Sequence, residues 1–267
     1  MLIDHSRYFV SKINTFKVYL FSMVMVFFTC DLRAQDGSIS PLPERKEGKY
    51  TWKKNHDPNG IGKFYLGREI AWVMGHQGAS WLERPEREKE ERPDKLLEIL
   101  KIKQGMVIAD IGAGSGYYTF RMSPKVGDKG KILAVDIQKE MIAILDKKIK
   151  DKNIKNVETI QSNEKDPKLP DGKLDLILMV DVYHEFNYPF EMVEKLIKAL
   201  KVGGKLVFVE FRLEDQNVPI LLVHKMSERQ VIREMDQFKQ LKHVETQKSL
   251  PWQHVMFFEK IVPTKKK

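Results

Sequence analysis

Cysteine is almost absent from this sequence, because Cys30 is the only one among 267 residues. A lone cysteine cannot close a disulfide within the chain or build a thiolate metal site. Histidines and carboxylates do not occur at the short spacings of known metal motifs either, so the sequence predicts no bound metal. The fold must therefore rest on an apolar core, and the 42% of hydrophobic residues are enough to build one.

The chain also lacks a long basic stripe, although its formal net charge is +9. Its 46 lysines and arginines are scattered among 37 acids, and the one purely basic run is Lys265–Lys267. Proteins that read nucleic acids usually carry a clustered basic face, often with interleaved aromatic residues. The pattern favours a small-molecule partner and argues against a nucleic acid.

Long hydrophobic runs are missing as well. The longest, VYLFSMVMVFF at residues 18–28, is shorter than the ~20 residues of a membrane-spanning helix. Lys12 and Lys17 precede it, and Leu32-Arg33-Ala34 follows, which is the layout of a secretory signal. We expect residues 1–34 to be a signal peptide that directs export to the periplasm or the medium. An uncleaved N-terminal anchor and a lipidated Cys30 are the alternatives.

The rest of the chain divides into three parts. Residues 35–50 are polar with two prolines and predict a linker. Residues 51–95 lack a clear period and predict an N-terminal helical cap, with a short helix over 68–74. Residues 96–262 alternate between strand and helix patterns, with strands expected over 106–111, 131–136, 156–161, 173–180 and 205–211, and over 242–246 and 254–261. Helices are expected over 117–126, 139–149, 189–200 and 227–238. This order predicts an α/β, Rossmann-like, doubly wound, seven-stranded and mostly parallel sheet that ends in an antiparallel hairpin.

A glycine-rich loop follows the first strand of that domain, in the run VIADIGAGSGYY from Val107 to Tyr118. Glycines there let the backbone turn tightly and approach a ligand at a helix N-terminus. A dinucleotide site would look similar, but Tyr117 stands near the place of its third glycine. Asp110 would repel a pyrophosphate and would suit a cationic ligand. Asp136, at the end of the second strand, can accept hydrogen bonds from ribose hydroxyls, or it could simply cap the next helix.

These residues carry a resemblance to the class I S-adenosylmethionine (SAM)-dependent methyltransferases, over roughly 95–261. The matching segments are DIGAGSG, the acid in ILAVDIQ, KLDLILMVDVYHEF and KVGGKLVFVE. The resemblance implies SAM as the cofactor and a binding site formed by Asp110, Gly112, Ala113, Gly114, Gly116, Asp136, Ile137, Asn163, Glu164 and Asp181. The chain is also similar to a branch of exported bacterial methyltransferases that share a DVYHEF segment.

Candidate catalytic residues follow the fourth strand, because ligands of such sheets bind at the carboxyl ends of strands. His184 and Glu185 are the main candidates for a base, although they could instead only order their loop. Others are Tyr183, Glu210, Arg212, His224 and Lys225, while His76 could belong to a lid. The sequence thus predicts in-line methyl transfer to a small molecule. A non-enzymatic SAM- or nucleoside-binding protein and a dinucleotide-dependent oxidoreductase are the alternatives.

Overall fold

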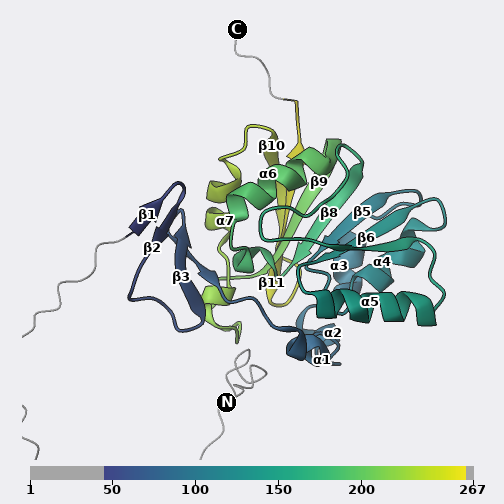
Figure 1. Cartoon of the computed structure of the whole chain (residues 1–267), viewed down its shortest axis with the longest axis horizontal. Coiled ribbons are helices and arrows are strands. Elements are labelled where there is room, and N and C mark those ends of the chain that lie inside the picture. The colour runs from purple at the N-terminus through teal and green to yellow at the C-terminus, as the bar shows by residue number, and fades with distance from the viewer. Residues whose placement is uncertain (1–44, 263–267) are drawn as a thin grey trace, which may run out of the picture.

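The computed structural model describes residues 45–262. The expected signal peptide, Cys30 and the basic run Lys265–Lys267 lie outside these residues, as do residues 35–44 of the expected linker. The described part consists of a seven-stranded sheet with its helices and a separate four-stranded sheet at one end (Figure 1). Within residues 45–262, none of the helices has the length and apolar character needed to cross a membrane.

The seven-stranded sheet has the order β10-β11-β9-β8-β5-β6-β7. Its strands are β5 (Val107–Ile111), β6 (Lys131–Asp136), β7 (Val157–Gln161), β8 (Leu174–Val180), β9 (Leu200–Phe211), β10 (Leu241–Gln247) and β11 (Gln253–Lys260). The five strands from β9 to β7 are parallel, whereas β11 pairs antiparallel with β9, and β10 pairs antiparallel with β11. The expected parallel sheet with a closing hairpin is therefore confirmed.

Both faces of this sheet are covered, which explains why its central strands β5, β6 and β8 are largely apolar and buried. Neighbouring residues of β5 point to opposite faces, so Ala109 joins the cluster under α6 (Pro189–Ala199) and α7 (Glu228–Met235). Ile108 joins the other cluster, with α3 (Pro93–Ile99), α4 (Thr119–Val126) and Leu145 of α5 (Lys139–Asp151). The Ser227 side chain caps α7, since it accepts a hydrogen bond from Gln230 N.

The N-terminal cap differs from the prediction. It begins as an antiparallel meander of β1 (Arg45–Glu47), β2 (Tyr50–Trp52), β3 (Gly60–Tyr65) and β4 (Arg68–Ala71), so the end of the expected linker lies in a sheet. The helix expected over 68–74 is wrong, because Leu66 and Gly67 both adopt positive φ and form a tight hairpin turn that pairs β4 with β3. Helices appear only afterwards, as α1 (Ala79–Leu82), α2 (Arg87–Glu90) and α3, with a 3-10 turn η2 (His76–Gly78).

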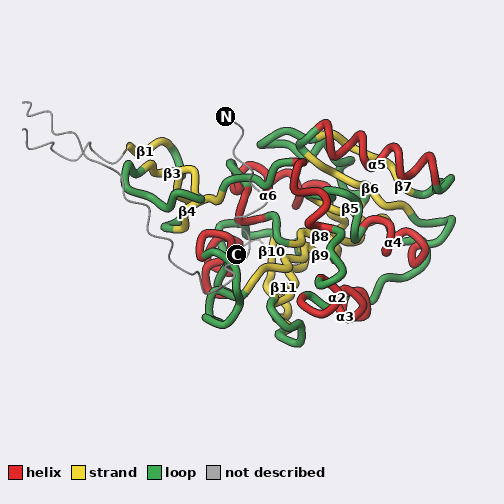
Figure 2. The backbone as a smooth tube through the Cα atoms, turned by 90° about the horizontal axis from the view of Figure 1, so that it is seen from below, coloured by secondary structure: helices red, strands yellow, loops and turns green. Residues whose placement is uncertain are grey.

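The small sheet lies at one end of the molecule, opposite β6 and β7 (Figure 2). A buried ion pair joins it to α7, with Arg68 Nε 2.7 Å from Glu234 Oε1. A second link joins it to the segment before α6, where Lys63 Nζ lies 3.4 Å from the centroid of the Tyr188 ring and donates to Asn187 Oδ1 at 3.0 Å. These buried contacts fix the cap against the large sheet.

Candidate functional site

The central cavity opens where the strand order reverses. The chain runs from β5 outward to β7 and then returns to β8 on the other side of β5, which makes the β5–β8 junction the switch point of the sheet. A cavity of about 320 Å³ lies at the carboxyl ends of β5, β6 and β8. This volume is within the usual range for small-ligand sites.

The glycine loop forms the floor of this cavity. Gly112 and Gly114 both line it and adopt positive φ, +67° and +55°. A side chain at Gly112 would overlap Val182, and a Cβ atom at Gly114 would lie 2.6 Å from Leu82 Cδ1. The loop is therefore shaped for bare backbone close to a ligand.

Asp136 lies beside the loop at the end of β6. Its Oδ2 accepts a hydrogen bond from Gly114 N at 2.9 Å, and its Oδ1 accepts one from Gln138 N at 2.9 Å. The carboxylate therefore ties the glycine loop to Gln138, which is the N-cap residue of α5, and Asp136 does not itself cap the helix. Burial raises its pKa, and because Asp136 also lines the cavity, its remaining lone pairs are available to a ligand hydroxyl.

Asp181, directly after β8, is the most unusual residue of the cavity wall. It adopts φ of +50°, a strained conformation for a residue with a side chain. Its Oδ2 accepts from Gln253 Nε2 at 2.6 Å, whereas its buried Oδ1 has no hydrogen-bond partner. Burial raises its pKa well above the usual range, and Glu91 and Glu210 add to the shift. A cationic donor in the cavity would satisfy this oxygen.

Most of the predicted cofactor residues line the cavity, namely Gly112, Gly114, Asp136, Ile137, Asn163, Glu164 and Asp181. Asp110, Ala113 and Gly116 do not line it. Asp110 is buried beneath the loop, where it accepts a hydrogen bond from Thr119 Oγ1 at 2.6 Å. Burial raises the pKa of Asp110 to about 6. Gly116 serves packing, because a Cβ atom there would collide with Phe120 and Leu145.

The cap supplies the opposite wall. Its segment from Trp72 to Met74 crosses the cavity and is tied at both sides. Gln138 Nε2 donates to Met74 O at 2.9 Å, and Met74 N donates to Glu185 Oε1 at 3.2 Å. Trp72 remains 59% exposed although it lines the cavity. This wall could not be predicted from the sequence, because the segment has no recognisable motif.

Arg87 was also missed. It lines the cavity from α2, is buried, and forms an ion pair with Glu91 at 2.7 Å. Its guanidinium stacks over Tyr117, 4.1 Å from the ring centroid. In the sequence it stands within a dense run of charges that looks like a solvated surface, so only the fold identifies it.

The two main catalytic candidates lie in the 3-10 turn η3 (Tyr183–Glu185) after β8. Glu185 lines the cavity, and burial raises its pKa to about 7. His184 lies behind it and is 1% exposed, with Nδ1 2.7 Å from Glu210 Oε2 and Nε2 3.1 Å from His224 Nδ1. Burial alone would lower the pKa of His184, but the charge and hydrogen bond of Glu210 outweigh it and raise that pKa. Burial and the charge of His184 lower the pKa of His224 to about 3.

Other candidates are engaged elsewhere. The Tyr183 hydroxyl donates to Glu234 at 2.6 Å, and Lys225 Nζ donates to the carbonyl of Asp215. Arg212 donates to the carbonyls of Leu250 and Gln253, each at 2.8 Å, which is a structural role. His76 lies in η2 between the cap strands and α1 and is not a lining residue of the cavity.

Comparisons with known proteins agree with this geometry. Residues 102–256 match the family model described as "Methyltransferase domain". A ubiquinone/menaquinone biosynthesis C-methyltransferase, UbiE of Shewanella sediminis, is 30% identical over 123 residues, which is 46% of this chain and 49% of that protein. UbiE of Shewanella baltica is 31% identical over 116 residues. The chain thus spans about half the length of the curated relatives it matches.

Two solved structures with a similar fold are also named as methyltransferases. A SAM-dependent methyltransferase from Aquifex aeolicus is 26% identical with a TM-score of 0.66, over 71% of this chain and all of that one. A putative type 11 methyltransferase from Sulfolobus solfataricus, 20% identical with a TM-score of 0.55, covers 67% of this chain and 97% of its own and shares the fold.

The site fits the cofactor of this family. The glycine floor admits a ligand close to the backbone, Asp136 can receive ribose hydroxyls, and the unpartnered oxygen of Asp181 suits a cation. The family model covers more than half of the chain. The protein therefore belongs to the methyltransferase family with the class I, SAM-dependent fold, and S-adenosylmethionine is its cofactor.

Proposed function

We propose that this protein transfers a methyl group from SAM to a small, largely apolar molecule bound between the sheet and the cap. One observation carries the proposal. A single cavity of about 320 Å³ is bounded on one side by the glycine loop and Asp136, and on the other by Trp72, Val73 and Met74 of the cap. Cofactor and acceptor would share this concave space, which suits a small molecule better than a macromolecule.

At the cofactor end, the chain's own groups bind and orient. SAM supplies an electrophilic methyl group on a sulfonium when it is bound. Asp136 would receive the ribose hydroxyls, and Ile137, which lines the cavity and is 38% exposed, would cover the adenine. Asp181 Oδ1 would accept from the ammonium group, because it is the buried carboxylate oxygen that lacks a donor. These contacts fix the position of the cofactor, and proximity supplies most of the acceleration in such reactions.

At the acceptor end, Glu185 is the carboxylate that faces the cavity, held by Met74 N. It would orient the acceptor and receive its proton if the attacking atom carries one. His184 does not line the cavity and would act as a positioning residue, through Glu210 and His224. The names of the UbiE relatives, which act in ubiquinone/menaquinone biosynthesis, support a small-molecule acceptor.

The test is calorimetric titration of the full chain with SAM. Asp181→Asn should weaken binding by about 1–3 kcal/mol, roughly 5- to 150-fold, because a hydrogen bond to a charged group is lost. Asp128→Asn removes the same charge from an exposed loop and serves as the matched control. Equal affinity of both variants and the parent chain would remove Asp181 from the cofactor site.

Export is a further part of the proposal, supported by the pattern of residues 1–34. Cell fractionation with N-terminal sequencing should find a chain that starts near Gln35 outside the cytoplasm. A full-length N-terminus on a domain that faces the cytoplasm would contradict it.

A further inference from the structure

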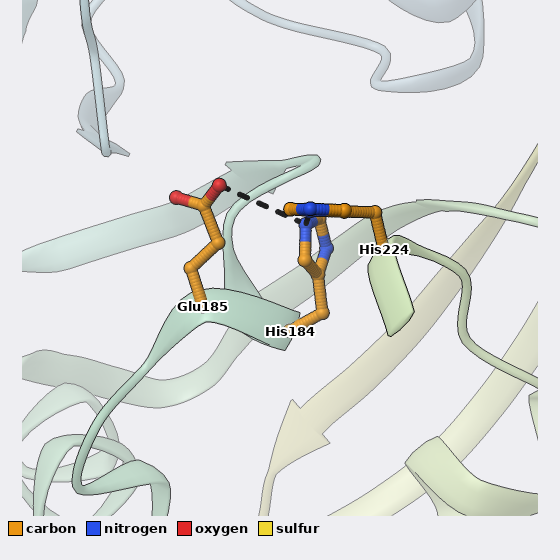
Figure 3. Close-up of side chains that lie close together, drawn as sticks. All are labelled: His184, Glu185 and His224. Carbon is orange, nitrogen blue, oxygen red and sulfur yellow. Dashed lines mark hydrogen bonds and ion pairs between the residues drawn. The ribbon is translucent and has the colours of Figure 1, made fainter. Parts of the chain in front are cut away.

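Three side chains that can bind metals meet at the edge of the cavity. His184 and Glu185 come from η3, and His224 comes from a second 3-10 turn, η4 (Leu222–His224). Figure 3 shows the three side chains converging from these two separate segments. One ligand atom of each lies within 4.8 Å of the others, and all three residues are less than 9% exposed. Among residues 45–262, these three form the one group of at least three histidines, cysteines or acids whose ligand atoms are close enough to share an ion.

The distances suit a tetrahedral ion. His184 Nε2 is 3.1 Å from His224 Nδ1 and 3.9 Å from Glu185 Oε1. Ligand atoms about 2.0–2.1 Å from a tetrahedral Zn²⁺ stand about 3.3 Å apart. Small side-chain rotations would bring all three atoms to that spacing.

The surroundings of His184 fix which of its nitrogens faces the cluster. Glu210 is fully buried, and its Oε2 lies 2.7 Å from Nδ1 of His184. The other oxygen of Glu210, Oε1, accepts a hydrogen bond from Tyr183 N at 3.0 Å. A carboxylate in this place holds the proton on Nδ1, which leaves the lone pair of Nε2 directed toward His224 and Glu185. Histidine ligands of metals usually have such an outer partner. Arg68 also donates to His184 O, which anchors the turn from the cap side.

We propose that His184, Glu185 and His224 bind a divalent first-row transition-metal ion, with Zn²⁺ the ion that best suits this set of donors. Two imidazoles and one carboxylate are a common protein set for such an ion, and they leave a fourth position open.

The position of this metal site indicates a role in binding the methyl acceptor, and this inference rests on the proposed function. Glu185 lines the same cavity as Gly112, Asp136 and Asp181, so the ion would lie at the acceptor end. Its open position would take an oxygen or sulfur atom of the acceptor, such as a phenol or a thiol. With the ion bound, coordination would lower the pKa of such a group, so its proton would go to solvent and Glu185 would serve as a ligand instead of a base. The inferred acceptor class is therefore a small apolar molecule with an anionic oxygen or sulfur.

A competing explanation is a shared proton. The 3.1 Å contact between the two imidazoles is also the length of a hydrogen bond, with one ring donating to the other. In that case the cluster is a buried polar network and has no affinity for metals. The two explanations differ in what the protein does with Zn²⁺.

The experiment is a calorimetric titration of the chelator-treated, tag-free, full-length chain with Zn²⁺. The site predicts one ion per chain, and His224→Asn and Glu185→Gln should each weaken binding at least tenfold. Glu210→Gln, which removes only the outer partner, should weaken it about 10- to 100-fold. His243→Asn is the matched control, because His243 lies on β10 at the other end of the sheet and contacts Thr246.

Co²⁺ provides a second readout that does not depend on affinity alone. The parent chain and His243→Asn should show the visible absorption of a four-coordinate Co²⁺ ion, and His224→Asn should lose it. Circular dichroism identifies a variant that fails to fold. If His224→Asn fails to fold, the Zn²⁺ affinity of Glu185→Gln, which is the smallest change, tests the site in its place. No Zn²⁺ binding by the folded parent chain, or equal binding by all variants, would overturn the proposal. SAM titration of the metal-free chain separates this failure from a failure of the proposed function.

Discussion

Asp110→Asn should stabilise the cofactor-free protein while it weakens cofactor binding. Asp110 is 3% exposed beneath the glycine loop. Burial raises its pKa from a usual 3.8 to about 6. The folded state therefore binds a proton more tightly than the unfolded state, and stability from this group is lost as the pH rises from about 4 through 6. A shift of this size corresponds to about 3 kcal/mol at pH 8.

Asparagine has no charge to bury and can still accept the hydrogen bond of Thr119. In urea unfolding at pH 8, the variant should therefore be more stable than the parent by up to ~3 kcal/mol. This difference in the free energy of unfolding should fall by about half at pH 5 and to under ~1 kcal/mol at pH 4. The loss of a negative charge near a cationic ligand should weaken SAM binding by ~1 kcal/mol. A variant that is less stable than the parent at pH 8, or an effect that does not depend on pH, would refute this reasoning.

The other predictions concern single contacts. Asp136→Asn puts an amide N–H against Gly114 N or Gln138 N, so SAM affinity should fall by ~1–3 kcal/mol in calorimetry with a native circular dichroism spectrum. Arg68→Met leaves buried Glu234 without its main charge partner and should lower the free energy of unfolding in urea by ~3–5 kcal/mol. The double variant Arg68→Met, Glu234→Met should regain most of this loss. Losses that simply add would contradict a coupled pair. Gly114→Ala adds a Cβ atom 2.6 Å from Leu82 Cδ1 at positive φ, so SAM binding should fall at least tenfold, whereas Gly105→Ala, at positive φ in open space, should leave it unchanged. His184→Asn should lower kcat more than SAM affinity, and equal loss of both would make His184 a purely structural residue.

The large sheet could be predicted from the sequence because its signals are local. The central strands β5, β6 and β8 are short apolar runs, and the glycine loop and Asp136 mark the ends of β5 and β6. Seven of the ten predicted cofactor residues line the cavity for the same reason, since their positions follow from strand ends. Asp110, Ala113 and Gly116 belong to the same motif but point into the protein, which the motif alone cannot reveal.

The cap and the histidine cluster depend on contacts between distant residues. The strand β4 forms because the turn at Leu66 and Gly67 returns the chain onto β3. Leucine is not a residue type that predicts such a turn. His224 is 40 residues from His184 in the sequence, yet its Nδ1 lies 3.1 Å from Nε2 of His184. Spacing along the chain does not reveal that these residues meet, and the prediction of no metal rested on spacing alone.

Calorimetric titration of the full-length chain with SAM and with S-adenosylhomocysteine tests the central claim most directly. The structure predicts one site per chain with micromolar affinity for both, weakened in Asp181→Asn and Asp136→Asn but unchanged in Asp128→Asn. The absence of binding by a well-folded sample would contradict the assignment of the cavity to this cofactor, and with it the proposed methyl transfer.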